Sequence, residues 1–492
     1  MLFSLFVPIG SLFNIDWFLF GISFHVDLIA KVFLLFTSFV WLMSALYAVH
    51  TISKRERSFW FWFFITFLGN FGLCFVSDVL GFYLFFSLMS FGAFGLIIHE
   101  KTKEAKEAAF VYIKYVIVGE VLLFIAIVSL VSQCGGTQFE QITCSDSLAT
   151  LILVLLAFGI KIGVFFLHSW LPLAHASAPA SASAVLSGVM LKAGVLGWIR
   201  FMPFGVASSE IAGYSLIVLG VLAIYGGLYG LTQNKLKSLL AYSSISQMGY
   251  VVVLFGLVLL DTQKSELLLY AILSFSAHHA LNKSALFLLS SEINKYGLDL
   301  RKVLLFAFFA LSLIGLPFTS GAIAKEMLKS GVDSSVLLAL LSLGAVVTAL
   351  LMLKFLSLSR EIQKVSSPLS PLLPIFGLFL GSLALPWILE SAGGFRWMQV
   401  LPFFMALGIY IFLKKQKIEI PLMPQGDMLA LFYLPRQELK KSRNIQKQRW
   451  DFSRALEAVF RSIEAALSQE KYVFLFLLGY LLFLSVLRFF LY

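Results

Sequence analysis

Ionisable side chains stand in the middle of long apolar runs of this sequence, where a charge is costly. The residues are Glu120 in YIKYVIVGEVLLFIAIV, Lys161 in LVLLAFGIKIGVFFLHSW, Lys192 in AVLSGVMLKAGVLGWIR, Lys283 in ILSFSAHHALNKSALFLL and Lys325 in LIGLPFTSGAIAKEML. A charged group at mid-membrane costs about 2.5–3.5 kcal/mol on insertion scales, so such groups are rare and mark ion pathways. A desolvated lysine releases its proton more easily than one in water. The pattern therefore predicts a proton relay through these five residues.

One histidine is expected to join this relay. His279 precedes Lys283 by four residues, so both side chains project from one face of a helix. The adjacent His278 points to another face and is interpreted as a structural hydrogen-bonding residue. His168 and His175 have no carboxylate or cysteine beside them in the sequence, so no metal site is predicted.

Some of the lysines have a simpler interpretation. Lys114 and Lys354 lie near expected helix ends, where a long side chain can reach the membrane surface. For these two, snorkelling is the favoured interpretation. The same alternative is weaker for Lys161, Lys192 and Lys283, because each has apolar sequence for more than one helical turn on both sides.

Helix-breaking residues lie beside two of the lysine-bearing segments. One group falls in the Ser- and Ala-rich stretch HSWLPLAHASAPASAS, and the other falls in GLPFTSG just before Lys325. Irregular backbone at membrane depth is tolerated only where it is buried in protein or lines a wet cavity, and it recurs in transporters. Two broken helices are therefore predicted, with the breaks at Pro172, Pro179, Gly315 and Pro317.

The chain has three cysteines. Cys74 lies inside an expected span and is interpreted as a packing residue. Cys134 and Cys144 share a loop on the expected outer face, where oxidation can occur, so a disulfide and two unpaired thiols both stay open. No Cys-x-x-Cys pair exists, so neither a structural metal nor an iron–sulfur cofactor held by this chain alone is predicted.

The elements that position these residues must be membrane helices. Of the 492 residues, 60% are hydrophobic and only 13% are charged, which is too few polar side chains to cover a soluble domain. The apolar runs are longer than barrel strands and do not alternate, so an all-α polytopic membrane protein of about 14 transmembrane helices is expected. The expected helices are 26–50, 58–76, 79–98, 108–131, 148–170, 182–203, 208–231, 236–260, 265–292, 303–328, 335–358, 369–388, 396–414 and 472–491.

The distribution of charge orients the chain. The formal net charge is +11, but Lys and Arg gather in alternate loops, whereas loops 132–147 and 389–395 contain neither residue. That asymmetry is the positive-inside pattern, so the basic loops are expected in the cytoplasm and no nucleic-acid partner is predicted. A multi-pass protein of a bacterial or archaeal cell (inner) membrane is expected.

Four regions are expected along the chain. They are a short apolar N-terminal segment over 1–25, a transmembrane core over 26–414, a cytoplasmic loop and lateral helix over 415–470, and a C-terminal anchor over 471–492. The lateral helix is predicted as amphipathic, because its apolar residues recur at steps of three and four. Those residues are Phe452, Leu456, Val459, Ile463 and Leu467.

The segment KIGVFFLHSWLPLAHASAPASASAVLSGVMLKAGVLGWIRF resembles the antiporter-like membrane subunits shared by respiratory complex I, group 4 membrane-bound hydrogenases and Mrp-type sodium/proton antiporters. The stretches NKLKSLLAYSSISQMGY, HHALNKSALF and GLPFTSGAIAKE extend the resemblance over most of 24–360. The resemblance implies two inverted five-helix repeats, each with a broken helix. It also implies roles for the lysines. Lys161 would serve the first channel, Lys192 would connect, His279 and Lys283 would form the central link, and Lys325 would lie on the exit side.

One residue departs from the family pattern. Family members carry a glutamate in a Phe-Trp-Glu-Leu pattern that pairs with the first lysine, whereas this chain has Ser87 in that place, within FYLFFSLMSF. Glu120 on the next helix is the expected substitute. If Glu120 does not supply the carboxylate, the charge-driven switching of Lys161 is impaired and the chain is a modified or non-pumping member of the family.

The resemblance implies a proton-translocating or cation/proton-exchanging subunit that works with other membrane subunits in a hetero-oligomer. The transported ions would be protons alone or protons and sodium. A redox-driven translocase whose chemistry sits on partners, a membrane energy-coupling partner of an inorganic-carbon uptake system and a scaffold remain alternatives. No catalytic triad, P-loop or dinucleotide fingerprint is present, so no catalytic activity is expected from this chain alone.

Overall fold

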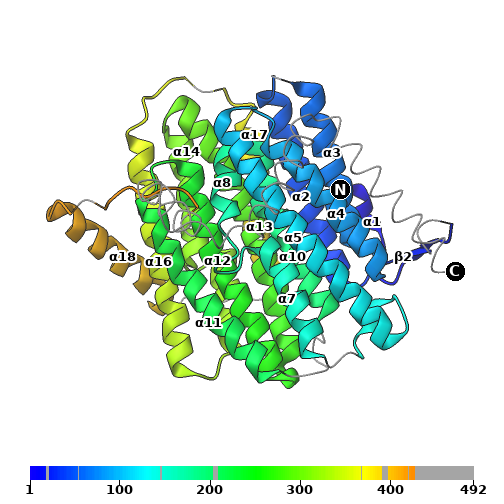
Figure 1. Cartoon of the computed structure of the whole chain (residues 1–492). Helices are drawn as coiled ribbons and strands as arrows, with labels where there is room; N and C mark the ends of the chain where they lie inside the picture. Colours follow the sequence, from blue (N-terminus) through cyan, green and yellow to red (C-terminus); the bar gives the residue numbers. More distant parts are fainter. Residues whose placement is uncertain are drawn as a thin grey trace, which may run out of the picture.

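The computed structural model describes residues 1–17, 21–53, 55–144, 147–202, 209–366, 368–389, 397–418 and 420–426. Helices make up most of the described chain (Figure 1). The elements are, in chain order, α1 (Leu2–Phe6), β1 (Leu12–Ile15), β2 (Ile22–His25), α2 (Leu28–Thr51), α3 (Glu56–Leu73), α4 (Val79–Ile97), α5 (Lys103–Cys134), α6 (Phe139–Ile142), α7 (Leu148–Ile162), α8 (Trp170–Ser177), α9 (Ala180–Val185), the π-helical turn η1 (Leu186–Met190), α10 (Leu191–Phe201), α11 (Glu210–Gly226), the 3₁₀ turn η2 (Gly227–Thr232), α12 (Leu236–Leu260), the 3₁₀ turn η3 (Thr262–Lys264), α13 (Ser265–Tyr296), α14 (Leu300–Ile314), α15 (Ser320–Ser330), α16 (Ser335–Arg360), α17 (Leu372–Ile388) and α18 (Trp397–Lys415).

The described helices include eight that are long and apolar enough to cross a membrane, and α7 and α17 are shorter apolar helices. This finding supports a polytopic helical membrane protein. The number of 14 spans remains a prediction. The expected lateral helix and final span lie in 427–492, outside the described residues, and also remain predictions.

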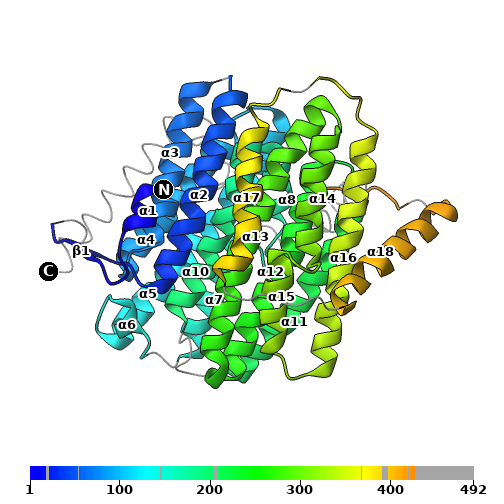
Figure 2. The same ribbon diagram turned by 180° about the vertical axis from the view of Figure 1, so that it is seen from behind.

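Helix α13 forms the centre of the bundle. It packs against α2, α9, α12, α14, α15 and α17, and it lies in the middle of the molecule in two opposite views (Figures 1 and 2). Nearly every residue between Ala271 and Ser290 is buried, including His278, His279 and Lys283. A helix that is buried on all sides can carry polar side chains at membrane depth without exposing them to lipid.

The N-terminal segment corrects the purely α-helical expectation. Strands β1 and β2 form an antiparallel hairpin with Leu12 opposite His25. The side chain of Asp78 accepts hydrogen bonds from the Ser23 amide at 2.9 Å and from the Gly81 amide at 2.7 Å, so it caps α4 and holds the hairpin to that helix. Each strand has only four residues, so its strand propensity is a weak signal beside the surrounding apolar sequence. For this reason the hairpin was not predicted.

Candidate functional site

The first broken helix brings Lys161 to the end of α7. The helix stops at Gly163, which has a left-handed φ of 78°, and α8 begins at Trp170. The indole N–H of Trp170 donates to the carbonyl of Ile160 at 2.9 Å, which satisfies one carbonyl near the open helix end. Lys161 therefore lies where regular structure stops.

The break begins earlier in the chain than predicted. Pro172 lies in the first turn of α8, where its missing N–H has no intrahelical partner to lose, so it does not cause the interruption. Pro179 occupies the N-cap position of α9 and separates that helix from α8. A glycine at the C-terminal end of a helix is the physical cause of the first break, because Gly163 adopts the left-handed conformation at little cost.

Lys161 and Glu120 line the same small cavity. The ammonium group of Lys161 donates to Ser90 Oγ at 3.0 Å and to the Tyr112 hydroxyl at 3.2 Å. The hydroxyl of Ser87 donates to a Glu120 carboxylate oxygen at 2.6 Å. The cavity offers about 10 Å³ to the centre of a water molecule, which is about the space that one bridging water needs. Glu120 and Lys161 also interact electrostatically, so a carboxylate from α5 faces the lysine of α7.

Lys192 and His279 meet in the centre of the bundle. The Lys192 ammonium contacts His279 Nδ1 and donates to the Ser187 carbonyl at 2.7 Å. Ser187 belongs to the π-helical turn η1, a feature that often marks functional sites. The tautomer of His279 is set by which group donates in this contact. Two polar groups 87 positions apart are thereby joined.

Lys283 lies one turn beyond His279 on α13. Its ammonium group donates to the Leu240 carbonyl of α12 at 3.0 Å. His175 of α8 is fully buried, stacks on the Phe287 ring with 4.6 Å between ring centroids, and interacts electrostatically with Lys283. Within the described part of the chain, neither ring nitrogen of His175 has a hydrogen-bond partner. An imidazole ring that makes no hydrogen bond within the described residues therefore lies near the central lysine.

The second broken helix positions Lys325. Helix α14 ends at Gly315, which has a φ of 91°, and α15 begins at Ser320, so Gly315 and Pro317 lie between the two helices. The Lys325 ammonium donates to the carbonyls of Leu313 at 2.8 Å and of Ile314 at 2.9 Å. These are the last carbonyls of α14, whose negative dipole end attracts a cation. The break thus creates the acceptors that hold the lysine.

His278 takes part in a separate hydrogen-bond network. Its Nδ1 lies 2.9 Å from Ser320 Oγ, and the Asn282 amide donates to the His278 carbonyl at 2.8 Å. Ser320 also contacts the hydroxyls of Ser312 at 3.1 Å and of Ser382 at 3.2 Å. This network joins α13, α14, α15 and α17, in agreement with the interpretation of His278 as a structural residue.

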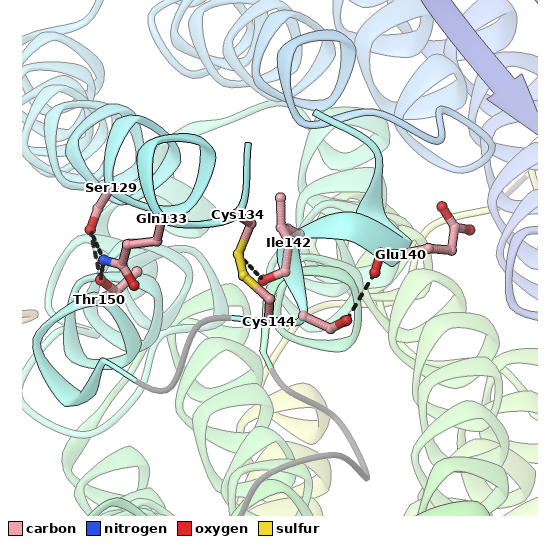
Figure 3. The surroundings of a disulfide bond; sticks show 8 residues. Ser129, Gln133, Cys134, Glu140, Ile142, Cys144 and Thr150 are labelled. Atoms are coloured by element: carbon pink, nitrogen blue, oxygen red, sulfur yellow. Dashed lines mark hydrogen bonds between the residues drawn. A yellow bond between two sulfur atoms is a disulfide. The ribbon is translucent and has the colours of Figure 1, made fainter. Parts of the chain in front are cut away.

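Cys134 and Cys144 lie at the end of the molecule opposite the basic loops. Cys134 and Cys144 are joined by a disulfide with 5.8 Å between their Cα atoms, and the bond closes a loop around α6 (Figure 3). Phe139 of that short helix packs edge-on against Phe82 and Phe201. The loop is therefore anchored to α4 and α10 as well as to α5.

Sequence reasoning missed Ser90 and Tyr112, which accept hydrogen bonds from Lys161. It also gave no relay role to His175, which lies near Lys283, and it did not single out Lys237. Ser90 had a signal, since it follows Ser87 by three positions and shares its helix face. The side chain of Lys237 is partly buried and donates to the Ala178 carbonyl at 2.6 Å, at the junction of α8 and α9.

Comparison with known proteins places this arrangement in a family. The family described as "NADH:quinone oxidoreductase/Mrp antiporter, TM" matches residues 76–352. NADH-quinone oxidoreductase subunit M of Rickettsia conorii is 31% identical over 360 residues, covering 68% of this chain and 72% of that subunit. Subunit M of Rhodobacter capsulatus is 29% identical, covering 62% of this chain and 65%, slightly less than two thirds, of its own length. One subunit of the Na(+)/H(+) antiporter of Alkalihalophilus pseudofirmus is 29% identical, covering 62% of this chain and 66% of its own length.

Two solved structures share the fold. The Mrp complex from Dietzia sp. aligns with a TM-score of 0.72 at 20% identity, covering 93% of this chain and 57% of the matched chain. An archaeal membrane-bound sulfane sulfur reductase aligns with a TM-score of 0.69 at 20% identity, covering 99% of this chain and 93% of the matched chain. The family match spans more than half of the 492 residues, and it includes both broken helices and every relay lysine. The resemblance stated from the sequence is thereby confirmed, and the chain belongs to the NADH:quinone oxidoreductase/Mrp antiporter transmembrane family.

Proposed function

We propose that this chain translocates protons, or exchanges protons for a cation such as sodium, as one subunit of a multisubunit membrane complex. The observation that carries the proposal is the set of buried ammonium groups held by neutral acceptors. Each of Lys161, Lys192, Lys283 and Lys325 donates to a carbonyl or hydroxyl oxygen. Such contacts can stabilise the ammonium form of a lysine and still allow it to lose its proton. A neutral acceptor stabilises the ammonium form less than a carboxylate would.

The proposed path follows the order of these groups through the bundle. Glu120 and Lys161 share the cavity at the first break, Lys192 contacts His279, and Lys283 lies one turn further along α13. Waters and hydroxyl groups would bridge the remaining gaps. Lys325, at the second break, would complete the path.

The finer architecture is part of the same proposal. Two helices that break beside a lysine, α7–α8 and α14–α15, support an internal duplication with inverted topology. About 14 spans, the cytoplasmic lateral helix over 415–470 and the final anchor over 471–492 complete the proposed chain. The partners would be other membrane subunits, as in the complexes that contain its relatives.

The test replaces single lysines in the assembled complex. Lys161→Met and Lys283→Met should each abolish proton flux into vesicles that contain the purified complex, while gel filtration shows intact assembly. Lys354→Met is the matched control, because this lysine is only partly buried and lies near the end of α16. Unaltered flux in both relay variants, with a functional wild-type complex, would refute the relay.

Iron content of the complex distinguishes the remaining alternatives. Stoichiometric iron–sulfur signal in the complex purified with this chain indicates a pump driven by redox partners. A complex without that signal indicates antiport or coupling to solute uptake, and bicarbonate-dependent proton uptake would favour the latter. A wild-type complex that assembles without any ion flux would identify a scaffold.

A further inference from the structure

A groove opens between α16 and α18 on the outside of the bundle. Its volume is about 810 Å³, within the range of sites for small organic ligands. Its apolar walls include Leu353 and Leu356 of α16 and Leu407 and Ile411 of α18. Ile411 is 55% exposed, so the groove leaves a large apolar surface uncovered in the described structure. An apolar surface of this kind in a membrane protein faces lipid or another subunit.

The two helices pack directly against each other beside the groove. Ala406 of α18 is fully buried and packs in a small cluster with Val346, Ala349 and Leu350 of α16. Beyond this contact α18 leans away from α16 toward its C-terminal end (Figure 1). The space between the helices therefore widens toward the residues that end them.

The wide end of the groove is basic. Arg360 ends α16, and Lys414 and Lys415 end α18, while Glu361 is the single acidic residue among the described residues that line the groove. Three cations against one carboxylate leave an excess of two positive charges. Guanidinium groups bind phosphate through paired hydrogen bonds, and lysines add point charge.

This basic end lies at the membrane surface that the basic loops define. The chain just after Arg360 pairs with the end of α13, where the Val365 amide donates to the Tyr296 carbonyl at 3.0 Å beside Lys295. Cations at this depth meet lipid headgroups, whereas the leucines of the groove lie at the depth of the acyl chains.

We propose that the groove binds an anionic phospholipid. The phosphate lies between Arg360, Lys414 and Lys415, and an acyl chain lies along the leucines between α16 and α18. Basic pockets between transmembrane helices on the cytoplasmic side bind acidic headgroups in this way. The lipid completes the packing of α18, which contacts α16 through the cluster around Ala406.

The chain that follows α18 turns toward other elements. The Met423 amide donates to the Thr232 carbonyl at 3.4 Å, and the Tyr229 hydroxyl donates to the Pro424 carbonyl at 3.0 Å. Both contacts are with η2, so this described segment is held there by its own hydrogen bonds. Charge complementarity favours a lipid phosphate as the occupant of the groove.

The first experiment measures lipid binding by native mass spectrometry. Phosphatidylglycerol or phosphatidylcholine with identical acyl chains is titrated into the delipidated complex that contains the full chain. Phosphatidylglycerol should bind more tightly. Each cation near the headgroups contributes about fivefold, so the triple variant Arg360→Gln/Lys414→Gln/Lys415→Gln should weaken phosphatidylglycerol binding on the order of 100-fold.

The matched control removes three lysines from the same membrane side. Lys101→Gln/Lys103→Gln/Lys106→Gln changes the net charge equally at the start of α5, outside the groove, and should leave binding within about twofold of wild type. Equal losses in the two triple variants would show only a general surface charge effect and would overturn the site. Equal binding of both lipids by the wild-type complex would also overturn it.

A second experiment identifies the occupant in the native membrane. A photo-reactive amino acid at Ser357, which lines the groove, should capture a phospholipid, detected as a mass increase of one lipid. The variant Ser357→Trp fills the groove while keeping all three cations, and it should displace the lipid. Capture of another subunit, or of residues 427–492 of this chain, would refute the lipid proposal.

Discussion

The hydrogen bond between Ser87 and Glu120 shows how a carboxylate of α5, instead of one on α4, can lie beside Lys161. Ser87 holds the carboxylate at 2.6 Å, and Lys161 and Glu120 line one cavity. Coulomb attraction depends on the distance between two charges and not on which helix carries them, so the source of the carboxylate matters less than its distance from the ammonium group.

This arrangement predicts the effect of moving the carboxylate. Glu120→Gln should lower proton flux by at least about tenfold, because the Lys161 charge loses its partner. The double variant Ser87→Glu/Glu120→Ala returns a carboxylate to α4 and should recover a substantial part of that flux. Ser87→Ala, which keeps Glu120, should cost only about 1 kcal/mol of stability and little flux. Flux equal to wild type in Glu120→Gln vesicles would contradict the assignment.

At the scale of the element, the helix breaks are built from backbone conformation as well as from proline. Gly315 ends α14 with a φ of 91°, and the last carbonyls of that helix hold Lys325. A Cβ at Gly315 would also lie 2.9 Å from Lys325 Cδ, which is tighter than side chains tolerate. The turn and the lysine therefore depend on each other.

Gly315→Ala should consequently destabilise the protein by about 1–2 kcal/mol and reduce flux, because alanine disfavours left-handed backbone and displaces the Lys325 side chain. Gly408→Ala is the control: this glycine lies within α18 with no described atom within 4 Å of an added Cβ, so alanine there should be neutral or slightly stabilising. Thermal unfolding in detergent and flux in vesicles measure both effects. Equal stability of the two variants would argue against a strained turn.

Across the whole molecule, distant segments are joined by a small number of polar links. Arg200 at the end of α10 donates two hydrogen bonds to Asp27, at 2.6 and 2.8 Å, and Asp27 also caps α2 through the Ala30 amide. Burial raises the pKa of Asp27, but the hydrogen bond and charge of Arg200, together with the Ala30 amide, outweigh burial and lower the pKa. The ionised form is thus favoured by folding.

Acid should therefore weaken this link. The pKa of an unfolded aspartate is about 3.9, so the contribution of Asp27 to stability is complete above that pH and is lost as the pH falls through the lower folded pKa. The side chains are partly exposed, which limits the contribution to about 1 kcal/mol. Asp27→Asn keeps a capping oxygen but removes the charge, so its unfolding midpoint should depend less on pH between about 5 and 3 than that of wild type. Identical pH profiles would exclude a role for the charge.

The disulfide closes a loop at the same end of the molecule, where Arg200 lies over the Phe139 ring. Linking Cys134 to Cys144 restricts a short loop in the unfolded chain, so Cys134→Ser/Cys144→Ser should lower the unfolding free energy by about 2–3 kcal/mol. Alkylation of the native protein should label these two cysteines only after reduction. Labelling without reductant would show that both are free thiols.

The amino-acid sequence by itself determined the class of protein and the identity of its intramembrane charges. A lysine within a long apolar run is a local signal, because the cost of placing its charge in lipid does not depend on which helices surround it. A glycine is a local signal for a different reason, because its own backbone allows the left-handed conformation that ends a helix. For these reasons Lys192, Lys325 and the break at Gly315 could be predicted from the order of residues alone.

Only the tertiary structure decided the partners. Lys192 meets His279 across 87 positions, and Lys161 finds its hydroxyl acceptors on α4 and α5, because side-chain contacts depend on how whole helices pack rather than on neighbours in the chain. The first break lies at Gly163 and not at Pro172, since a proline in the first turn of a helix is compatible with that helix. Local residue chemistry therefore determined which charges enter the membrane, and packing of distant segments determined what each charge can exchange a proton with.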